Sequence, residues 1–131
     1  MAIKGVKELV AEANTKIECI SAEDAMNMAD KDDVTIIDIR DVRELYREGK
    51  IPGAVHAPRG MLEFWFDPAS PYHKEVFATG NKMVLHCASG WRSALAALTL
   101  QEMGFDNIAH IDSGYKGWKD AGGVTEVVEK K

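Results

Sequence analysis

The sequence is poor in cysteine and lacks long apolar runs, and each shortage excludes a class of protein. Its two cysteines, Cys19 and Cys87, are too few for a disulfide framework, although the count alone leaves a single disulfide open. No stretch approaches the roughly 18 consecutive apolar residues of a membrane span. Lys4 also stands where a signal peptide needs its apolar core. We therefore expect a cytoplasmic protein with no membrane partner.

Clusters of basic residues are also lacking, apart from the terminal Lys130 and Lys131. The 16 basic and 21 acidic side chains give a net charge of −5, which disfavours nucleic acid as a partner. An anionic substrate would have to be attracted by a local field. With 131 residues, 46% of them hydrophobic and 28% charged, the chain is expected to fold as one domain, residues 1–131.

Strand-like and helix-like segments alternate along the chain. Residues 34–39 form a β-branched, nearly all-apolar run, which is typical of a strand covered on both faces. The alternation predicts an α/β domain with a central parallel sheet of about five strands and helices on both faces. Further short strands are expected at 17–20, 55–58, 83–86 and 108–111, and helices at 21–29, 45–49, 93–103 and 114–121.

An extra helix is predicted at the N-terminus, residues 1–15, ahead of a core at 17–123. Ile3, Val6, Val10 and Ala13 recur at helical spacing, with Leu9 beside them. We expect this face to pack on the domain, with partner binding as the alternative. Cys19, in the short strand that follows, is expected to be a small buried hydrophobic residue.

The candidate nucleophile is Cys87, which lies between an apolar strand and a helix-like segment. A thiol placed there faces the backbone N–H groups and the positive end of the helix, and should ionise readily. In an open parallel sheet, functional sites gather at the carboxyl ends of the strands. The strand ending at Asp38 and Arg40 supplies a second polar edge, so both strand ends are expected to form one site.

The spacing from Cys87 to Arg92 narrows the chemistry. Cysteine-dependent tyrosine phosphatases place five residues between the nucleophilic cysteine and the arginine, whereas four residues separate Cys87 from Arg92. A tighter ring of N–H donors suits a smaller anion, such as a terminal sulfur on the cysteine. A phosphatase or an arsenate reductase of the cysteine-dependent kind is therefore the less favoured alternative.

Four motifs in order resemble those of the rhodanese family of sulfurtransferases. Cys-Ala-Ser-Gly-Trp-Arg-Ser at 87–93 is similar to the family's active loop, and 38–44 to the segment after its second strand. Residues 49–54 resemble Gly-His-Ile-Pro-Gly-Ala, with Lys50 at the histidine. Residues 113–118 resemble Gly-Gly-x-x-x-Trp, with Ser113 at the first glycine. The resemblance implies a rhodanese-like fold.

The resemblance also implies a mechanism. Cys87 would take sulfane sulfur from a small sulfur-containing anion such as thiosulfate and hold it as a persulfide. An acceptor, cyanide in vitro or a thiol or protein, would then remove it. The N–H groups of the loop would stabilise the anionic persulfide without any cofactor or metal. These groups belong to Ala88, Ser89, Gly90, Trp91, Arg92 and Ser93. A persulfide carrier or sulfur-binding module with little turnover of thiosulfate is the main alternative.

Supporting or substrate-binding roles are expected for four charged residues in or near the loop. Arg92 either attracts an anionic donor or pins the loop through a carboxylate; we favour the second, with Asp38 as its partner. Asp38 and Arg40 are interpreted as supports of the loop, and an ordinary strand-end cap is the alternative for Asp38. Arg59 is a candidate for binding the donor's anionic group, unless it is a solvated surface arginine.

Trp91 stands where small residues are common in the family. A large exposed indole would form a wall of the pocket, with Phe64 or Trp65, and would favour an acceptor larger than cyanide. Core burial is the alternative for Phe64 and Phe66. Strand alternation turns His86 away from Cys87. The remaining histidines, His56, His73 and His110, lack metal-ligand spacing and are expected to be structural. Trp118 is also expected to be structural.

Overall fold

The computed structural model describes residues 2–130 and contains one five-stranded sheet. All pairings are parallel, in the order β1-β5-β4-β2-β3. The strands are β1 Glu18–Ile20, β2 Val34–Asp38, β3 Val55–His56, β4 Lys82–His86 and β5 Ile108–Ile111. The sheet confirms the predicted α/β architecture, and β2 and β4 lie side by side in its centre.

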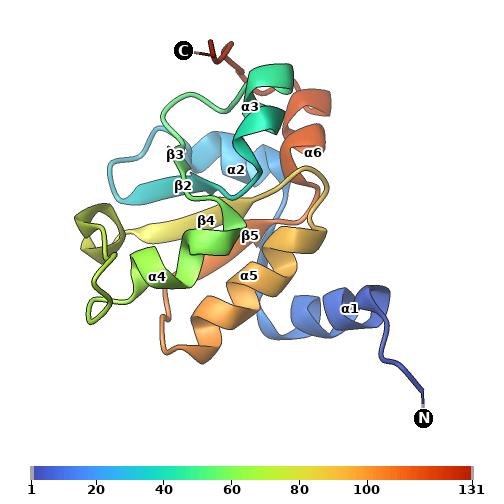
Figure 1. The fold of residues 1–131 in the computed structure, drawn as a ribbon. Coiled ribbons are helices and arrows are strands. Elements are labelled where there is room, and N and C mark those ends of the chain that lie inside the picture. Colours follow the sequence, from blue (N-terminus) through green and yellow to red (C-terminus); the bar gives the residue numbers. More distant parts are fainter. Residues whose placement is uncertain (1, 131) are drawn as a thin grey trace.

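Helices cover both faces of this sheet (Figure 1). On one face lie α1 Val6–Lys16, α4 Leu62–Phe66 and α5 Trp91–Glu102. On the other lie α2 Ala22–Met28 and α6 Gly114–Asp120, with α3 Val42–Glu48 beside α6. Two short 3-10 turns, Arg59–Met61 and Glu75–Ala78, flank α4. No helix within residues 2–130 has the length and apolar character needed to cross a bilayer.

The central strands are apolar on both sides because each side meets a helical layer. In β2, Ile37 packs toward α5 while its neighbour Ile36 packs toward α2 and α6. In β4, Leu85 likewise packs on the α5 side of the sheet and Val84 on the side of α2 and α6. This alternation explains why residues 34–39 are almost continuously hydrophobic.

The N-terminal helix packs on the domain through part of its predicted face. Val10 and Ala13 of α1 are buried in the core beneath α5. The prediction was wrong at its start, because the helix begins at Val6 after an extended Gly5, and Ile3 is 95% exposed. Gln101 of α5 donates a hydrogen bond to the Lys16 carbonyl and ties the two helices together.

Candidate active site

Cys87 immediately follows β4, and its sulfur lies inside the turn that leads to α5. The Gly90 N–H donates to Cys87 Sγ over 3.1 Å, and the Ser93 N–H donates over 3.4 Å. The Cys87 thiol faces the Ser93 hydroxyl oxygen at 3.6 Å. Sulfur is thus surrounded by donors that favour negative charge. Two loop N–H groups reach Sγ, fewer than the six expected from Ala88 to Ser93.

The turn is short because α5 begins at Trp91 rather than at Ser93. Gly90 ends the turn with φ of +98°, a left-handed conformation that glycine adopts without strain. A Cβ atom at Gly90 would overlap the carbonyl oxygen of Asp112, which follows β5. The loop therefore needs glycine at this position for two reasons, backbone conformation and close approach.

The first turn of α6 supports the loop from behind. The Tyr115 N–H donates to the Cys87 carbonyl over 2.8 Å, and the Lys116 N–H donates to the Ala88 carbonyl over 3.1 Å. Gly114 has φ of +67°, and any Cβ there would collide with the Ala88 carbonyl. The motif at 113–118 therefore positions the backbone that carries Cys87.

Arg92 pins the loop through a carboxylate, but the expected partner was wrong. Its Nη1 and Nη2 donate to Glu44 Oε2 and Oε1, each over 2.9 Å. Hydrogen bonding from Arg92 is the main cause that holds the pKa of Glu44 below its ordinary value. The Arg92 pKa is raised, first by hydrogen bonding to Glu44 and to a smaller extent by Cys87. The pair links α3 to the start of α5.

Asp38 is occupied by Arg40, two residues further on. Arg40 Nε and Nη2 donate to its carboxylate over 3.0 and 2.8 Å, and both side chains are fully buried. Burial alone would raise the pKa of Asp38, but the hydrogen bonds and the charge of Arg40 leave it lowered. Arg40 Nη2 also binds the Gly49 carbonyl, and its guanidinium stacks 4.1 Å from the Tyr115 ring centre. The pair fixes the neighbouring turn and α6, not Cys87 directly.

His86 points to the face opposite Cys87, as strand alternation predicts. Its ring stacks on Tyr115 with centres 6.1 Å apart, and its Nδ1 lies 3.2 Å from the Cys87 carbonyl oxygen. Burial is the main cause that lowers the pKa of His86 below its ordinary value of 6.5. The imidazole is therefore neutral at physiological pH and does not act as a base on the thiol.

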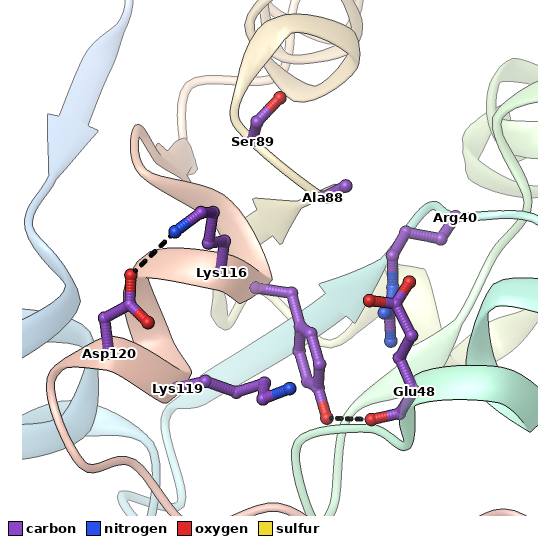
Figure 2. A pocket seen from close by; sticks show the side chains of 8 residues that line it. Arg40, Glu48, Ala88, Ser89, Lys116, Lys119 and Asp120 are labelled. Carbon is purple, nitrogen blue, oxygen red and sulfur yellow. Dashed lines mark hydrogen bonds and ion pairs between the residues drawn. The ribbon is translucent and has the colours of Figure 1, made fainter.

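A cavity of about 390 Å³ opens beside the loop (Figure 2). Ala88 and Ser89 lie along one side of it, and Lys119 and Glu48 lie opposite. Lys116 pairs with Asp120 at 3.0 Å, while Lys119 Nζ lies 5.8 Å from the Tyr115 ring centre. The cavity also reaches Arg40, whose buried Nη1 has no hydrogen-bond partner. This opening brings cationic side chains next to the loop.

Arg59 is held in an ion pair, and Trp91 does not form the expected wall with Phe64 or Trp65. Arg59 Nη1 pairs with Glu63 at 2.7 Å, and its backbone N–H binds the Ile39 carbonyl. Trp91 is 48% exposed, and no aromatic contact within residues 2–130 includes it. Aromatic pairs form elsewhere: Trp65 stacks on Phe77, Phe64 meets Tyr72 edge to face, and Phe66 is buried against Phe77 and Phe105.

Cys19 is exposed, so its predicted burial was wrong. The reason is its place on β1, an edge strand paired only with β5. The thiol donates to Asn14 Oδ1 over 3.4 Å and lies 3.5 Å from His110 Nε2. Desolvation is the main cause that raises its pKa, which does not favour a second nucleophile here.

Two residues near the thiol were not assigned a role in the site from the sequence. Glu44 serves a capping box with Asp41 at the start of α3, and the same carboxylate holds Arg92. The Asp-x-x-Glu spacing was a signal for the cap, but not for the ion pair. His110 binds the Ser93 hydroxyl at 2.8 Å. Its signal was a single polar side chain inside the apolar strand 108–111.

Comparison with known families gives one match over most of the chain. The model of the rhodanese-like domain matches residues 21–121. A thiosulfate sulfurtransferase, GlpE of Pseudoalteromonas translucida, is 31% identical over 116 residues, covering 85% of this chain and 95% of that protein. The proposed sulfur carrier YrkF of Bacillus subtilis is 29% identical over 109 residues. The match covers 82% of this chain and about half of YrkF, 54%.

Two solved structures extend the comparison. A protein of unknown function from Rhodopseudomonas palustris, described as a possible tyrosine phosphatase, has a TM-score of 0.92 and 49% identity. The match covers 96% of this chain and 97% of that one. The polysulfide-sulfur transferase homodimer of Wolinella succinogenes has a TM-score of 0.70 and 28% identity, over 94% and 88% of the two chains.

Proposed function

The chain belongs to the rhodanese-like domain family, and we propose that it is a sulfurtransferase carrying sulfane sulfur on Cys87. The observation that carries the proposal is the placement of Cys87 Sγ among the N–H groups of Gly90 and Ser93. Such donors stabilise a sulfur anion, either the thiolate or the persulfide. The sulfurtransferase names of GlpE and the Wolinella protein support the same reaction class.

The transfer takes place in two steps. The Cys87 thiolate attacks the outer sulfur of thiosulfate, a new S–S bond forms, and sulfite leaves with the electron pair of the broken bond. Cyanide, or a thiolate, then attacks the outer sulfur of the persulfide and regenerates the Cys87 thiolate. No net proton or electron is exchanged over the cycle, and the kinetics are ping-pong.

The loop covers the Cys87 side chain closely. Cys87 is only 1% exposed, so the donor's sulfur must reach into the turn. The adjacent cavity carries Lys116 and Lys119 on its walls together with Glu48 and Asp120. Because Lys116 is paired with Asp120, Lys119 is the lysine that would attract an anionic donor. Arg59, which is held by Glu63, is less available for this role than the sequence suggested.

Phosphatase chemistry is disfavoured by Arg92. In that chemistry a guanidinium binds the transferring phosphoryl group, whereas Arg92 directs one N–H of each terminal nitrogen at Glu44, which competes for that role. The loop is also one residue shorter than the phosphatase loop. Wild-type protein should therefore leave a phenyl phosphate ester intact, and efficient hydrolysis of that ester would contradict this argument.

Intact mass tests the proposal. Protein incubated with thiosulfate should gain the mass of one sulfur atom and lose it again when cyanide is added. Cys87→Ser should gain nothing, while Cys19→Ser should gain the sulfur as wild type does. Absence of any gain in wild type would refute the proposal. A gain followed by very slow loss to cyanide would favour a persulfide carrier, the activity suggested by the name of YrkF.

A further inference from the structure

A continuous chain of hydrogen bonds links the Cys87 thiol, through Ser93 and His110, to Asn14 at the surface. Cys87 Sγ lies 3.6 Å from Ser93 Oγ, and Ser93 Oγ lies 2.8 Å from His110 Nδ1. His110 Nε2 lies 2.9 Å from Asn14 Oδ1, at the outer end. Cys87 is 1% exposed, and Ser93 and His110 are completely buried. The chain of hydrogen bonds therefore links a buried thiol to a buried imidazole by one hydroxyl group.

Asn14 determines which nitrogen of His110 carries the proton. An amide oxygen only accepts hydrogen bonds, so His110 Nε2 donates to Asn14 Oδ1. Nδ1 is then unprotonated and accepts the hydroxyl hydrogen of Ser93. This leaves a lone pair of Ser93 Oγ for the Cys87 S–H. All donors along this chain of hydrogen bonds point in one direction, from the thiol to the imidazole.

We propose that Ser93 and His110 form a relay that removes the proton from Cys87 and so prepares the nucleophile. The proton of Cys87 moves to Ser93 Oγ while the hydroxyl proton of Ser93 moves to His110 Nδ1. The step transfers two protons and involves no oxidation or reduction. The new Ser93 O–H then points at the thiolate and adds a third donor to those of Gly90 and Ser93. The relay rests on the proposed role of Cys87 as nucleophile.

His110 acts through Ser93 and is therefore a positioning residue. After the transfer, Ser93 Oγ and Asn14 Oδ1 accept its two N–H groups, so the imidazolium is fully hydrogen-bonded. Asn14 belongs to α1, and this helix lies before the residues that the family model matches. The N-terminal helix thereby contributes to the site by fixing the tautomer of His110.

Several charged or titratable groups face the two ends of the relay. Cys19 of β1 lies beside His110 Nε2, and Arg92, paired with Glu44, lies near Cys87. Burial lowers the pKa of His110, and Asp112 partly opposes this effect. A lone imidazolium is therefore unfavourable, and His110 holds the proton only while the thiolate balances its charge. Imidazolium and thiolate form together.

The pH dependence of Cys87 alkylation by iodoacetamide tests the relay, with the modified peptide quantified by mass spectrometry. His110→Asn and Ser93→Ala remove the proton acceptor or its bridge. Each should move the midpoint of the rate profile upward by about one pH unit, which is roughly tenfold slower alkylation below the midpoint. His73→Asn, which removes a histidine bound to the Trp65 carbonyl, is the matched control and should leave the midpoint unchanged.

A variant that lowers the midpoint of the alkylation profile distinguishes a relay from a purely structural role of His110. Asn14→Asp places a carboxylate on His110 Nε2, strengthens the base, and should lower the midpoint. Asn14 is exposed, so this variant also stands if His110→Asn fails to fold. Unchanged midpoints in Asn14→Asp and Ser93→Ala would overturn the relay. Alkylation needs no sulfur donor, so a failure of sulfur loading in wild type would refute the proposed function independently of this result.

Discussion

The guanidinium of Arg92 and the carboxylate of Glu44 meet through two parallel hydrogen bonds, each 2.9 Å long. The pair joins α3, which follows β2, to the first turn of α5, which follows the Cys87 loop. Arg92 is 42% exposed and Glu44 16%, so water and salt weaken the pair as a source of stability. Its main effect is geometric, since the two contacts fix the orientation of the turn around sulfur.

Glu44→Gln should therefore affect the reaction more than the fold. One bond and the charge attraction are lost, so the turn loosens, and the rate of sulfur loading from thiosulfate should fall roughly threefold to tenfold. The free energy of unfolding should fall by less than about 1 kcal/mol. Intact-mass time courses and urea unfolding measure the two effects. Arg43→Gln, which breaks the exposed pair with Asp41, is the control. Loading at the wild-type rate in Glu44→Gln would contradict this geometric role.

Gly90→Ala should be far more damaging than a glycine substitution at an open turn. Alanine at φ of +98° is strained by roughly 1–2 kcal/mol, and its Cβ would also overlap the Asp112 carbonyl. Gly53→Ala meets similar strain at φ of +81° but no neighbouring atom within 4 Å. Urea unfolding should give the larger loss for Gly90→Ala, together with loss of sulfur loading. Equal losses in the two variants would show that close approach is unimportant at Gly90.

Acid should destabilise the protein through His86. Because its folded pKa is lowered from 6.5, mainly by burial, the unfolded chain binds a proton below pH 6.5 that the folded protein excludes. Its contribution is thus fully present above pH 6.5 and is lost as the pH falls toward the lowered folded value. This slope is at most about 1.4 kcal/mol per pH unit for one histidine.

Urea unfolding of His86→Gln across this pH range measures that contribution. The variant should show a shallower loss of stability below pH 6.5 than wild type, even if its stability at pH 7 is lower. His73→Gln, whose imidazole is only half-buried, is the matched control. An unchanged slope in His86→Gln would assign the acid sensitivity to other groups.

Trp91→Ala should change the choice of acceptor. The half-exposed indole begins α5 at the mouth of the loop, where it can pack against an organic thiol but offers little to cyanide. The ratio of sulfur transfer to a tripeptide thiol over transfer to cyanide should fall several-fold, and Trp91→Phe should restore much of it. Steady-state rates with both acceptors give this ratio, and a constant ratio would remove Trp91 from acceptor recognition.

The strands and the loop were predictable because their signals are local. The apolar run at 34–39 and the turn between Cys87 and Arg92 follow from backbone and side-chain preferences within a few residues. The partner of Arg92 was not predictable in this way. Asp38 ends the adjacent strand, but its carboxylate is already satisfied by Arg40, and only the path of α3 brings Glu44 to Arg92.

The burial or exposure of single residues such as Cys19 and His110 could not be predicted from the sequence either. Cys19 lies on an edge strand and is exposed, whereas His110, its neighbour in the pairing of β1 with β5, is fully buried. The order of the strands decides both outcomes, and no pattern within either short segment encodes that order. The contacts of His110 with Ser93 and Asn14 join residues separated by 17 and 96 positions, which local reasoning does not reach.

The position of β1 and α1 ahead of residue 21 has a practical consequence for anyone who grafts this module into a fusion protein. A segment cut at the family boundaries, 21–121, would lack β1. The backbone groups of β5 that now pair with β1 would then be exposed. The cut would also remove Asn14 from His110. A transplant should therefore begin no later than Gly5, ahead of the first turn of α1.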